Sequence, residues 1–164
     1  MLGQFSTRLL AAVAVCVTAI PLPGFAAAEM PLIWTARSSG GLTALAYGPI
    51  DPAQDPLFLL SCFNGMSIAV LDVHKGITGI EPGQPITIEI NSTKAQSPVA
   101  GEVARDDETG ATFGEASNIS VKPVLEVLRN PGPLTIKMGA TSATLPDQGR
   151  LEAVGQFSQN CTLD

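Results

Sequence analysis

Residues 56–73, PLFLLSCFNGMSIAVLDV, place an Asn-Gly pair between two apolar runs. Asn-Gly in this setting is the strongest short-range hairpin signal, because a type I′ turn needs positive φ at both central positions. A two-residue turn here pairs Phe63 with Met66 and Leu59 with Val70. Both faces of the hairpin are then apolar, so we expect other parts of the chain to cover it on both sides.

The hairpin contains Cys62, and the other cysteine outside the N-terminal apolar run is Cys161. Two cysteines in an exported protein most often pair. The closed loop spans about a hundred residues, for which chain entropy predicts a stabilisation of ~4–5 kcal/mol. A metal or redox pair is the alternative, but the chain has no Cys-x-x-Cys and a single histidine. We therefore predict a structural disulfide between Cys62 and Cys161.

The N-terminal region has the pattern of an export signal. Arg8 precedes an apolar run over residues 9–20, which is too short to span a bilayer comfortably. Prolines follow, and three alanines supply a small-residue cleavage site. The sequence predicts a cleavable signal peptide over residues 1–28, cut between Ala28 and Glu29, and a single exported β-rich domain over residues 29–164. An uncleaved membrane anchor is the alternative.

The short, alanine-rich signal is typical of bacteria and predicts a periplasmic or secreted protein of a Gram-negative cell. The chain has 9 basic and 15 acidic residues and a net charge of −6. Nucleic acids and anionic membranes both require clustered Lys and Arg, so the composition argues against both. No long apolar stretch follows the signal, and no membrane span is expected after cleavage. A protein partner in the cell envelope is expected, whereas the oligomeric state stays open.

Apolar alternation predicts further strands around the hairpin. It is cleanest in PITIEIN, residues 85–91, where the isoleucines share one face and Thr87 and Glu89 the other. Other strands are expected over residues 42–48, 97–105, 111–116 and 134–145, the last with a turn at Gly139. Residues 29–39 predict an edge strand whose Trp34 packs over the end of the core.

Two later segments change to a helical period. The first covers residues 121–130 after an N-cap at Ser120. The second runs from a cap at Asp147 to about residue 160, with Leu151, Val154 and Phe157 on its apolar stripe. The sequence thus predicts a mainly β fold with two short helices, either β-sandwich-like or α+β. Its centre is the hairpin between Pro56 and Val73, to which the disulfide links the C-terminal helix.

Few residues suggest catalysis or metal binding. The single histidine, His74, follows Asp72 by two residues, which gives a remote hydrolase hypothesis with both on one face of a strand. One histidine excludes a multi-histidine zinc site, and no nucleophile elbow or phosphate-binding loop is present. Glu89 and Glu102 lie on neighbouring expected strands and could face each other. The turn Asp106–Glu108 could bind calcium weakly, although a solvated turn is the ordinary explanation. We expect no cofactor, no metal and no enzymatic activity.

The order of these pieces resembles a layout found in small periplasmic proteins of Gram-negative bacteria. Leu59-Leu60-Ser61-Cys62 is followed by a polar turn and a second apolar strand, and a tail from Ala143 through Phe157 ends at Cys161. The layout is similar to that of periplasmic accessory proteins associated with type VI secretion and, more distantly, to the invasion-associated locus B family. The resemblance implies a disulfide-stapled periplasmic β-domain that acts through contacts, and it carries over no functional residue beyond the two cysteines.

Three functions remain as hypotheses. The first is a non-enzymatic envelope protein that acts through protein–protein interaction. The second is a small-ligand-binding β-domain with a pocket between the sheet and the helix over residues 121–130. The third is the hydrolase that uses Asp72 and His74.

Overall fold

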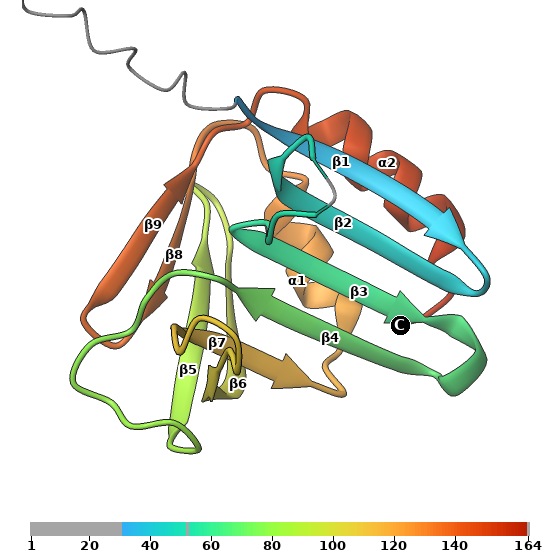
Figure 1. The fold of residues 1–164 in the computed structure, drawn as a ribbon. Helices are drawn as coiled ribbons and strands as arrows, with labels where there is room; N and C mark the ends of the chain where they lie inside the picture. Colours follow the sequence, from blue (N-terminus) through green and yellow to red (C-terminus); the bar gives the residue numbers. More distant parts are fainter. Residues whose placement is uncertain (1–30, 52, 164) are drawn as a thin grey trace, which may run out of the picture.

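A computed structural model describes residues 31–51 and 53–163 of the chain. In this part of the chain, nine strands form one antiparallel sheet and two α-helices pack against it (Figure 1). The elements are β1 (Leu32–Ser39), β2 (Leu42–Pro49), β3 (Phe58–Phe63), β4 (Ile68–Val73), β5 (Pro85–Asn91), β6 (Gln96–Arg105), β7 (Thr112–Ser117), α1 (Val121–Leu128), β8 (Leu134–Met138), β9 (Thr141–Leu145) and α2 (Arg150–Asn160). The predicted mainly β fold with two helices is therefore confirmed.

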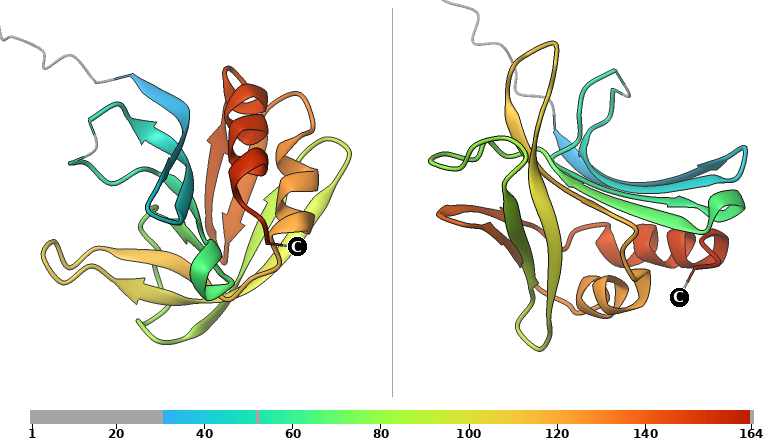
Figure 2. Two further views of the ribbon diagram at one scale, coloured as in Figure 1. Left: turned by 90° about the vertical axis from the view of Figure 1, so that its right-hand side faces the viewer. Right: turned by 90° about the horizontal axis from the view of Figure 1, so that it is seen from below.

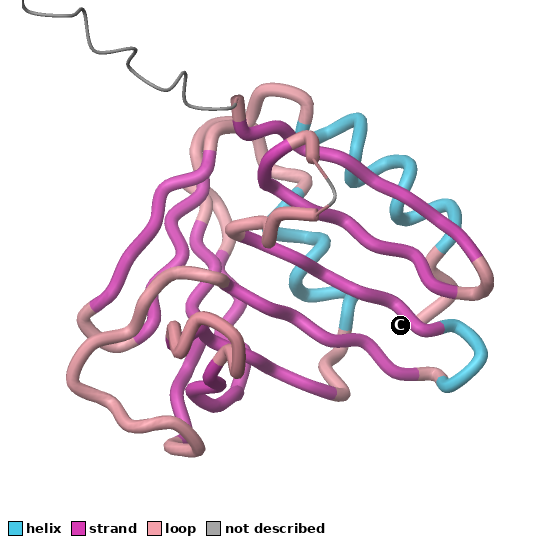
Figure 3. The backbone as a smooth tube through the Cα atoms, in the orientation of Figure 1, coloured by secondary structure: helices cyan, strands magenta, loops and turns pink. Residues whose placement is uncertain are grey.

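The strand order across the sheet is β1-β2-β3-β4-β7-β6-β5-β8-β9. Most strands pair with a neighbour in the sequence, but β4 pairs with β7 and β5 with β8. The sheet is bent, and both helices lie on its concave side (Figure 2; Figure 3 shows the same path by secondary structure). We call the helix-covered side the inner face and the opposite side the outer face. A single sheet with helices on one face is the α+β alternative rather than the sandwich. No helix in the described ranges is long and apolar enough to cross a membrane.

Side chains on the inner face form one core with the two helices. The predicted alternation of β5 is confirmed, because its three isoleucines are buried whereas Thr87 and Glu89 are exposed. Trp34 lies on the inner face of β1, with its ring 5.2 Å from that of Tyr47 and 5.5 Å from that of Phe58. It therefore packs over the end of the core, as an edge-strand tryptophan was expected to do.

The β3–β4 hairpin differs from its prediction in register. Phe63 pairs with Ile68 and Leu59 with Asp72, so the strands are shifted by two residues from the expected pairing. A four-residue loop replaces the two-residue turn. Residues Asn64–Met66 form a 3₁₀ turn, and Ser67 supplies the left-handed conformation at φ 54°. The positive φ therefore occurs at Ser67, the last residue of the loop, and not at Asn64 or Gly65 as a type I′ turn requires.

The predicted disulfide between Cys62 and Cys161 is present and joins residues 99 positions apart. A second link lies beside it. The Asn64 amide donates to the carbonyl of Asn160 at 2.7 Å, and its oxygen accepts from the backbone N–H and the hydroxyl of Thr162 at 3.0 and 3.2 Å. The hairpin loop and the chain after α2 are thus held together both covalently and by hydrogen bonds.

Helix α2 begins later than predicted. Its first residue is Arg150, and Gly149 at φ 79° occupies the N-cap position. Asp147 instead accepts a hydrogen bond from the backbone N–H of Gly132 at 2.9 Å. The buried stripe also differs, because it starts with Arg150 whereas Leu151 is 50% exposed. Val154 and Phe157 are buried as expected.

The Arg150 side chain is fully buried and organises the end of α1. Its guanidinium donates to four backbone carbonyls, those of Leu128, Asn130, Gly132 and Pro146. Burial lowers the pKa of Arg150, but an arginine stays charged in a protein. Because two of these carbonyls lie at or just after the C-terminal end of α1, the helix dipole also favours the cation. Arg150 therefore joins α2 to α1 and to the segment before β8.

Candidate functional site

The outer face of β1–β4 is an apolar surface that neither α-helix covers. On β3 and β4 its residues are half-buried, apart from the buried Ser61, whereas the alternating inner-face residues are fully buried. The half-buried apolar members are Leu59, Phe63, Ile68 and Val70. At the hairpin end, Leu42 is 37% exposed and Met66 is 62% exposed. No described helix lies over this face (Figure 2). The helices therefore cover the hairpin on one face only, and not on both faces as predicted.

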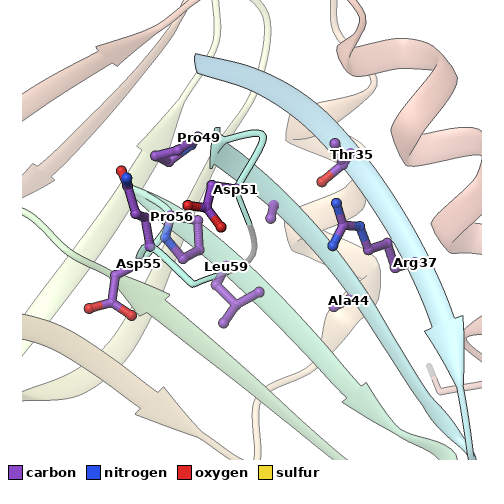
Figure 4. A pocket seen from close by; sticks show the side chains of 10 residues that line it. Thr35, Arg37, Ala44, Pro49, Asp51, Asp55, Pro56 and Leu59 are labelled. Atoms are coloured by element: carbon purple, nitrogen blue, oxygen red, sulfur yellow. The ribbon is translucent and has the colours of Figure 1, made fainter. Parts of the chain in front are cut away.

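A pocket of about 320 Å³ opens on this outer face beneath the loop between β2 and β3 (Figure 4). Its floor consists of small or apolar outer-face side chains from three strands, including Ala44, Ala46 and Leu59. The wall comes from the loop, with Asp51 and Asp55 at its rim. The lining is therefore apolar below and acidic on the loop side.

Arg37 lies on the opposite side of the pocket from this loop and comes from β1 (Figure 4). The side chain is exposed, and none of the described residues forms a hydrogen bond or an ion pair with its guanidinium. Asp51 is partly engaged, because one of its oxygens accepts from the backbone N–H of Ala53 at 3.0 Å. The pocket thus offers a free cation on one side and carboxylates on the other.

A close backbone approach places the loop that forms the wall. A Cβ built on Gly48 would lie 2.5 Å from the Cα of Pro56 and 2.6 Å from its Cβ. Real Cβ atoms do not approach backbone this closely, so the loop can return over β2 only because position 48 has no side chain. Gly48 is therefore a positioning residue for the pocket.

A row of three carboxylates crosses the outer face farther along the sheet. Asp72 of β4 pairs with Glu115 of β7, which pairs with Glu102 of β6. Directly opposed side chains lie about 4.5–5.5 Å apart at Cβ, so these like charges repel. Burial and the neighbouring Glu115 raise the pKa of Asp72 from 3.8 to about 6. The expected meeting of Glu89 with Glu102 is wrong, because Glu89 pairs with Pro98 and Lys137.

Asp72 and His74 share the outer face as alternation predicted, but they do not interact. The His74 ring stacks on Phe113, with centroids 4.6 Å apart and planes 12° apart, and Phe113 is on the same face of β7 as Glu115. Within residues 31–51 and 53–163, no hydrogen bond or ion pair joins the Asp72 carboxylate to His74. The structure therefore does not assemble the catalytic pair of the hydrolase hypothesis.

The acidic turn uses its first carboxylate to hold its own backbone. Asp106 accepts from the backbone N–H of Thr109 at 2.6 Å, the Thr109 hydroxyl at 2.8 Å and the N–H of Glu108 at 3.0 Å. The N–H and hydroxyl of Thr109 hold the pKa of Asp106 below its ordinary value. No cluster of three metal-ligating side chains occurs among the described residues. This geometry is that of a hydrogen-bonded turn.

The ligand pocket predicted between the sheet and the helix over residues 121–130 is not where the open space lies. Val121, Val124 and Leu128 of α1 are fully buried and fill that region. The pocket of Figure 4 is on the other side of the sheet. The signal in the sequence that could have located it is PIDPAQD, residues 49–55, whose prolines and aspartates are typical of a loop. The predicted cleavage site at Ala28 and Glu29 lies outside the described residues.

Comparison of the chain with family models, with curated proteins and with solved structures returned no match. The resemblance in layout to small periplasmic proteins therefore stays a prediction, and the candidate sites rest on their own geometry.

Proposed function

We propose that this protein is a non-enzymatic, exported binding module that recognises another protein through the outer face of β1–β4. The observation that carries the proposal is the exposure of that face. Half-buried apolar residues on β3 and β4 continue into the exposed Leu42 and Met66 without a covering layer. Contiguous exposed apolar surface in a folded domain is typical of a protein-interaction site.

The proposed location is the periplasm or the exterior of a Gram-negative cell. Two features support it: the export pattern of the sequence and the disulfide, because disulfides persist in oxidising compartments. The disulfide and the Arg150 hydrogen bonds hold the sheet and the helices around one core, which keeps this surface rigid. A rigid, stapled face loses little conformational entropy on binding a partner.

The test is site-specific photo-crosslinking in the cell envelope of the source bacterium, with the reactive group at Leu42. We expect a discrete protein adduct that Val70→Lys abolishes, because a lysine on the outer face of β4 disrupts apolar contact. Ala100→Lys is the matched control, since Ala100 is exposed on the outer face of β6, away from the hairpin. An adduct that forms equally in folded Val70→Lys protein contradicts the proposal.

A small-ligand-binding function is the second candidate, and the pocket of Figure 4 favours it. Its volume of about 320 Å³ lies at the lower end of the range for ligand sites. The free Arg37 guanidinium would bind a carboxylate or phosphate while an apolar group rests on the alanine floor. A thermal-shift screen of anionic small molecules tests this function. A stabilising compound whose effect disappears in Arg37→Gln supports it, and a screen without any stabilising compound refutes it.

A further inference from the structure

One strand edge of the sheet borders a groove. Strand β1 is the first in the sheet order and pairs on one side with β2 over all eight of its residues. In an antiparallel pair, alternate residues direct their N–H and C=O groups away from the partner strand. No described residue hydrogen-bonds to these outward backbone groups of β1. The edge of β1 is therefore a free row of donors and acceptors.

A hollow of about 300 Å³ lies along this edge, between β1 and α2. Its strand side is lined by four consecutive residues, 34–37, rather than by alternate ones. Side chains of consecutive strand residues point to opposite faces, so a hollow that touches all four must border the backbone edge itself. Its helix side is lined by the N-cap residue Gly149 and by Glu152, Ala153 and Gln156 of α2, which together follow the i, i+3, i+4, i+7 spacing of one helix face. Helix α2 runs beside the edge strand β1 (Figure 1), and the hollow between them forms one groove.

Edge strands are usually protected against pairing by prolines, bulges, short length or several charges. Strand β1 has the sequence LIWTARSS, pairs without a bulge and carries one charge, that of Arg37. The opposite edge strand, β9, has five residues against the eight of β1. The β1 edge is thus the longer and the one that a helix flanks.

We propose that the groove between β1 and α2 binds an extended segment of a partner protein, which adds to the sheet as a further antiparallel strand. This inference goes beyond the proposed function, because it adds a second binding surface to the module and names the chemistry of the segment that binds there. Strand addition beside a helix is a general mode of peptide recognition, in which the backbone supplies affinity and alternate side chains supply specificity.

The groove specifies which side chains the segment should carry. On the outer side of β1, the Arg37 guanidinium has no partner among the described residues, so an acidic side chain opposite it forms a cross-strand ion pair. On the inner side, the groove is floored by Ala36 and Ala153, whose small side chains leave room for an apolar one. Glu152 on the helix wall disfavours an acidic residue on that side. The segment therefore alternates apolar residues facing inward with acidic residues facing outward.

Three labelled heptapeptides test this specificity by fluorescence anisotropy on the oxidised protein. The first is Thr-Val-Glu-Val-Glu-Val-Thr, the second replaces both Glu by Lys, and the third replaces the central Val by Pro. We expect the Glu peptide to bind about fivefold more tightly than the Lys peptide. A peptide Glu opposite Arg37 forms a favourable cross-strand pair, whereas a peptide Lys at the same position is repelled. The Pro peptide loses binding because it lacks a backbone donor.

The matched variants are Arg37→Glu and Arg105→Glu, which place the same change on exposed positions of β1 and β6. Arg37→Glu should reverse the preference between the Glu and Lys peptides, and Arg105→Glu should leave it unchanged. Equal binding of the two peptides to wild type and to Arg37→Glu overturns the proposed specificity. Strand addition by a partner is overturned if none of the peptides binds. It is also overturned if the protein self-associates and the Glu peptide does not reverse that self-association.

The outcome also separates this inference from the proposed function. If no peptide binds but Val70-dependent crosslinking persists, the groove inference fails alone. If the peptides bind as expected and Val70→Lys crosslinks normally, the outer-face function fails and the groove remains the binding site.

Discussion

Arg150 gives the sharpest prediction about what stabilises this fold. Replacing it by Met keeps an unbranched apolar stem of similar length and removes every donor. The carbonyl of Leu128, which receives the fully buried bond at 2.9 Å, is then left without a partner, at a cost of ~1–3 kcal/mol. The other three carbonyls are partly buried, so water replaces part of what they lose. We expect Arg150→Met to lower the free energy of unfolding by about 3–5 kcal/mol, the sum of the full cost at Leu128 and smaller costs at the other three carbonyls.

A conservative variant and a neighbouring arginine make the test specific. Arg150→Lys retains the charge but concentrates its donors on one nitrogen, which cannot reach four carbonyls, so we expect a loss of about 2 kcal/mol. Arg129→Met is the control, because Arg129 is exposed and its guanidinium donates to the Ser158 hydroxyl at the surface. A surface change of this kind costs less than about 0.5 kcal/mol.

The measurement is urea unfolding of the oxidised proteins by far-UV circular dichroism, with the midpoints compared at a common m-value. Circular dichroism is preferred to fluorescence because the single tryptophan, Trp34, lies 5.9 Å from the Arg150 guanidinium and would report the substitution itself. If Arg150→Met and Arg129→Met unfold within about 1 kcal/mol of each other at the same m-value, the buried network does not hold the helices as we argue.

Three further predictions concern the disulfide, the acidic row and the pocket loop. Cys161→Ser should lower the free energy of unfolding by ~4–5 kcal/mol through loss of the long loop, and a loss below about 1 kcal/mol would contradict that reasoning. Because the pKa of Asp72 is raised in the folded state, its charge opposes folding, and stability should fall as pH rises from about 4 to about 6. Asp72→Asn should remove this pH dependence and raise the free energy of unfolding at pH 7 by about 1 kcal/mol, a value reduced for the solvent screening of a half-exposed group. A variant whose urea midpoints vary with pH as those of the wild type do would contradict this prediction. Gly48→Ala should displace the loop at Pro56, lowering the thermal midpoint and abolishing ligand shifts in the pocket, whereas an unchanged midpoint would show that the close approach is unimportant.

Much of the fold follows from local patterns in the sequence. The strand and helix segments were predicted because alternation and helical spacing are properties of short stretches. Alternation also grouped the side chains of the hairpin correctly by face, although the predicted register was wrong and the face that lies inward was not predicted. A four-residue loop in place of a two-residue one moves every pair by two positions, and side chains alternate with the same period. The error therefore exchanged cross-strand partners but left the same side chains together on each face.

The missed features depend on long-range contacts. Nothing local in β4 indicates that Asp72 meets Glu115, because the β4–β7 pairing joins segments with two other strands between them. Arg150 was missed because an arginine in a helix normally faces solvent. One signal was available: Arg150 precedes Val154 by four positions and Phe157 by seven, which places it on the buried stripe. The groove likewise exists only once β1 is known to be an edge strand that lies beside α2.

The disulfide between the hairpin and Cys161 also determines the order in which parts of the domain can fold. A chain made from its N-terminus completes β3 and β4 long before α2 exists, so the inner face of the hairpin, with Leu60 and Leu71, is left without its cover. At the usual synthesis rate of ~5–20 residues per second, that interval lasts several seconds. During it, an apolar sheet with a free edge is open to aggregation and to chaperones. The disulfide cannot form until Cys161 has been made, which is after all of α2.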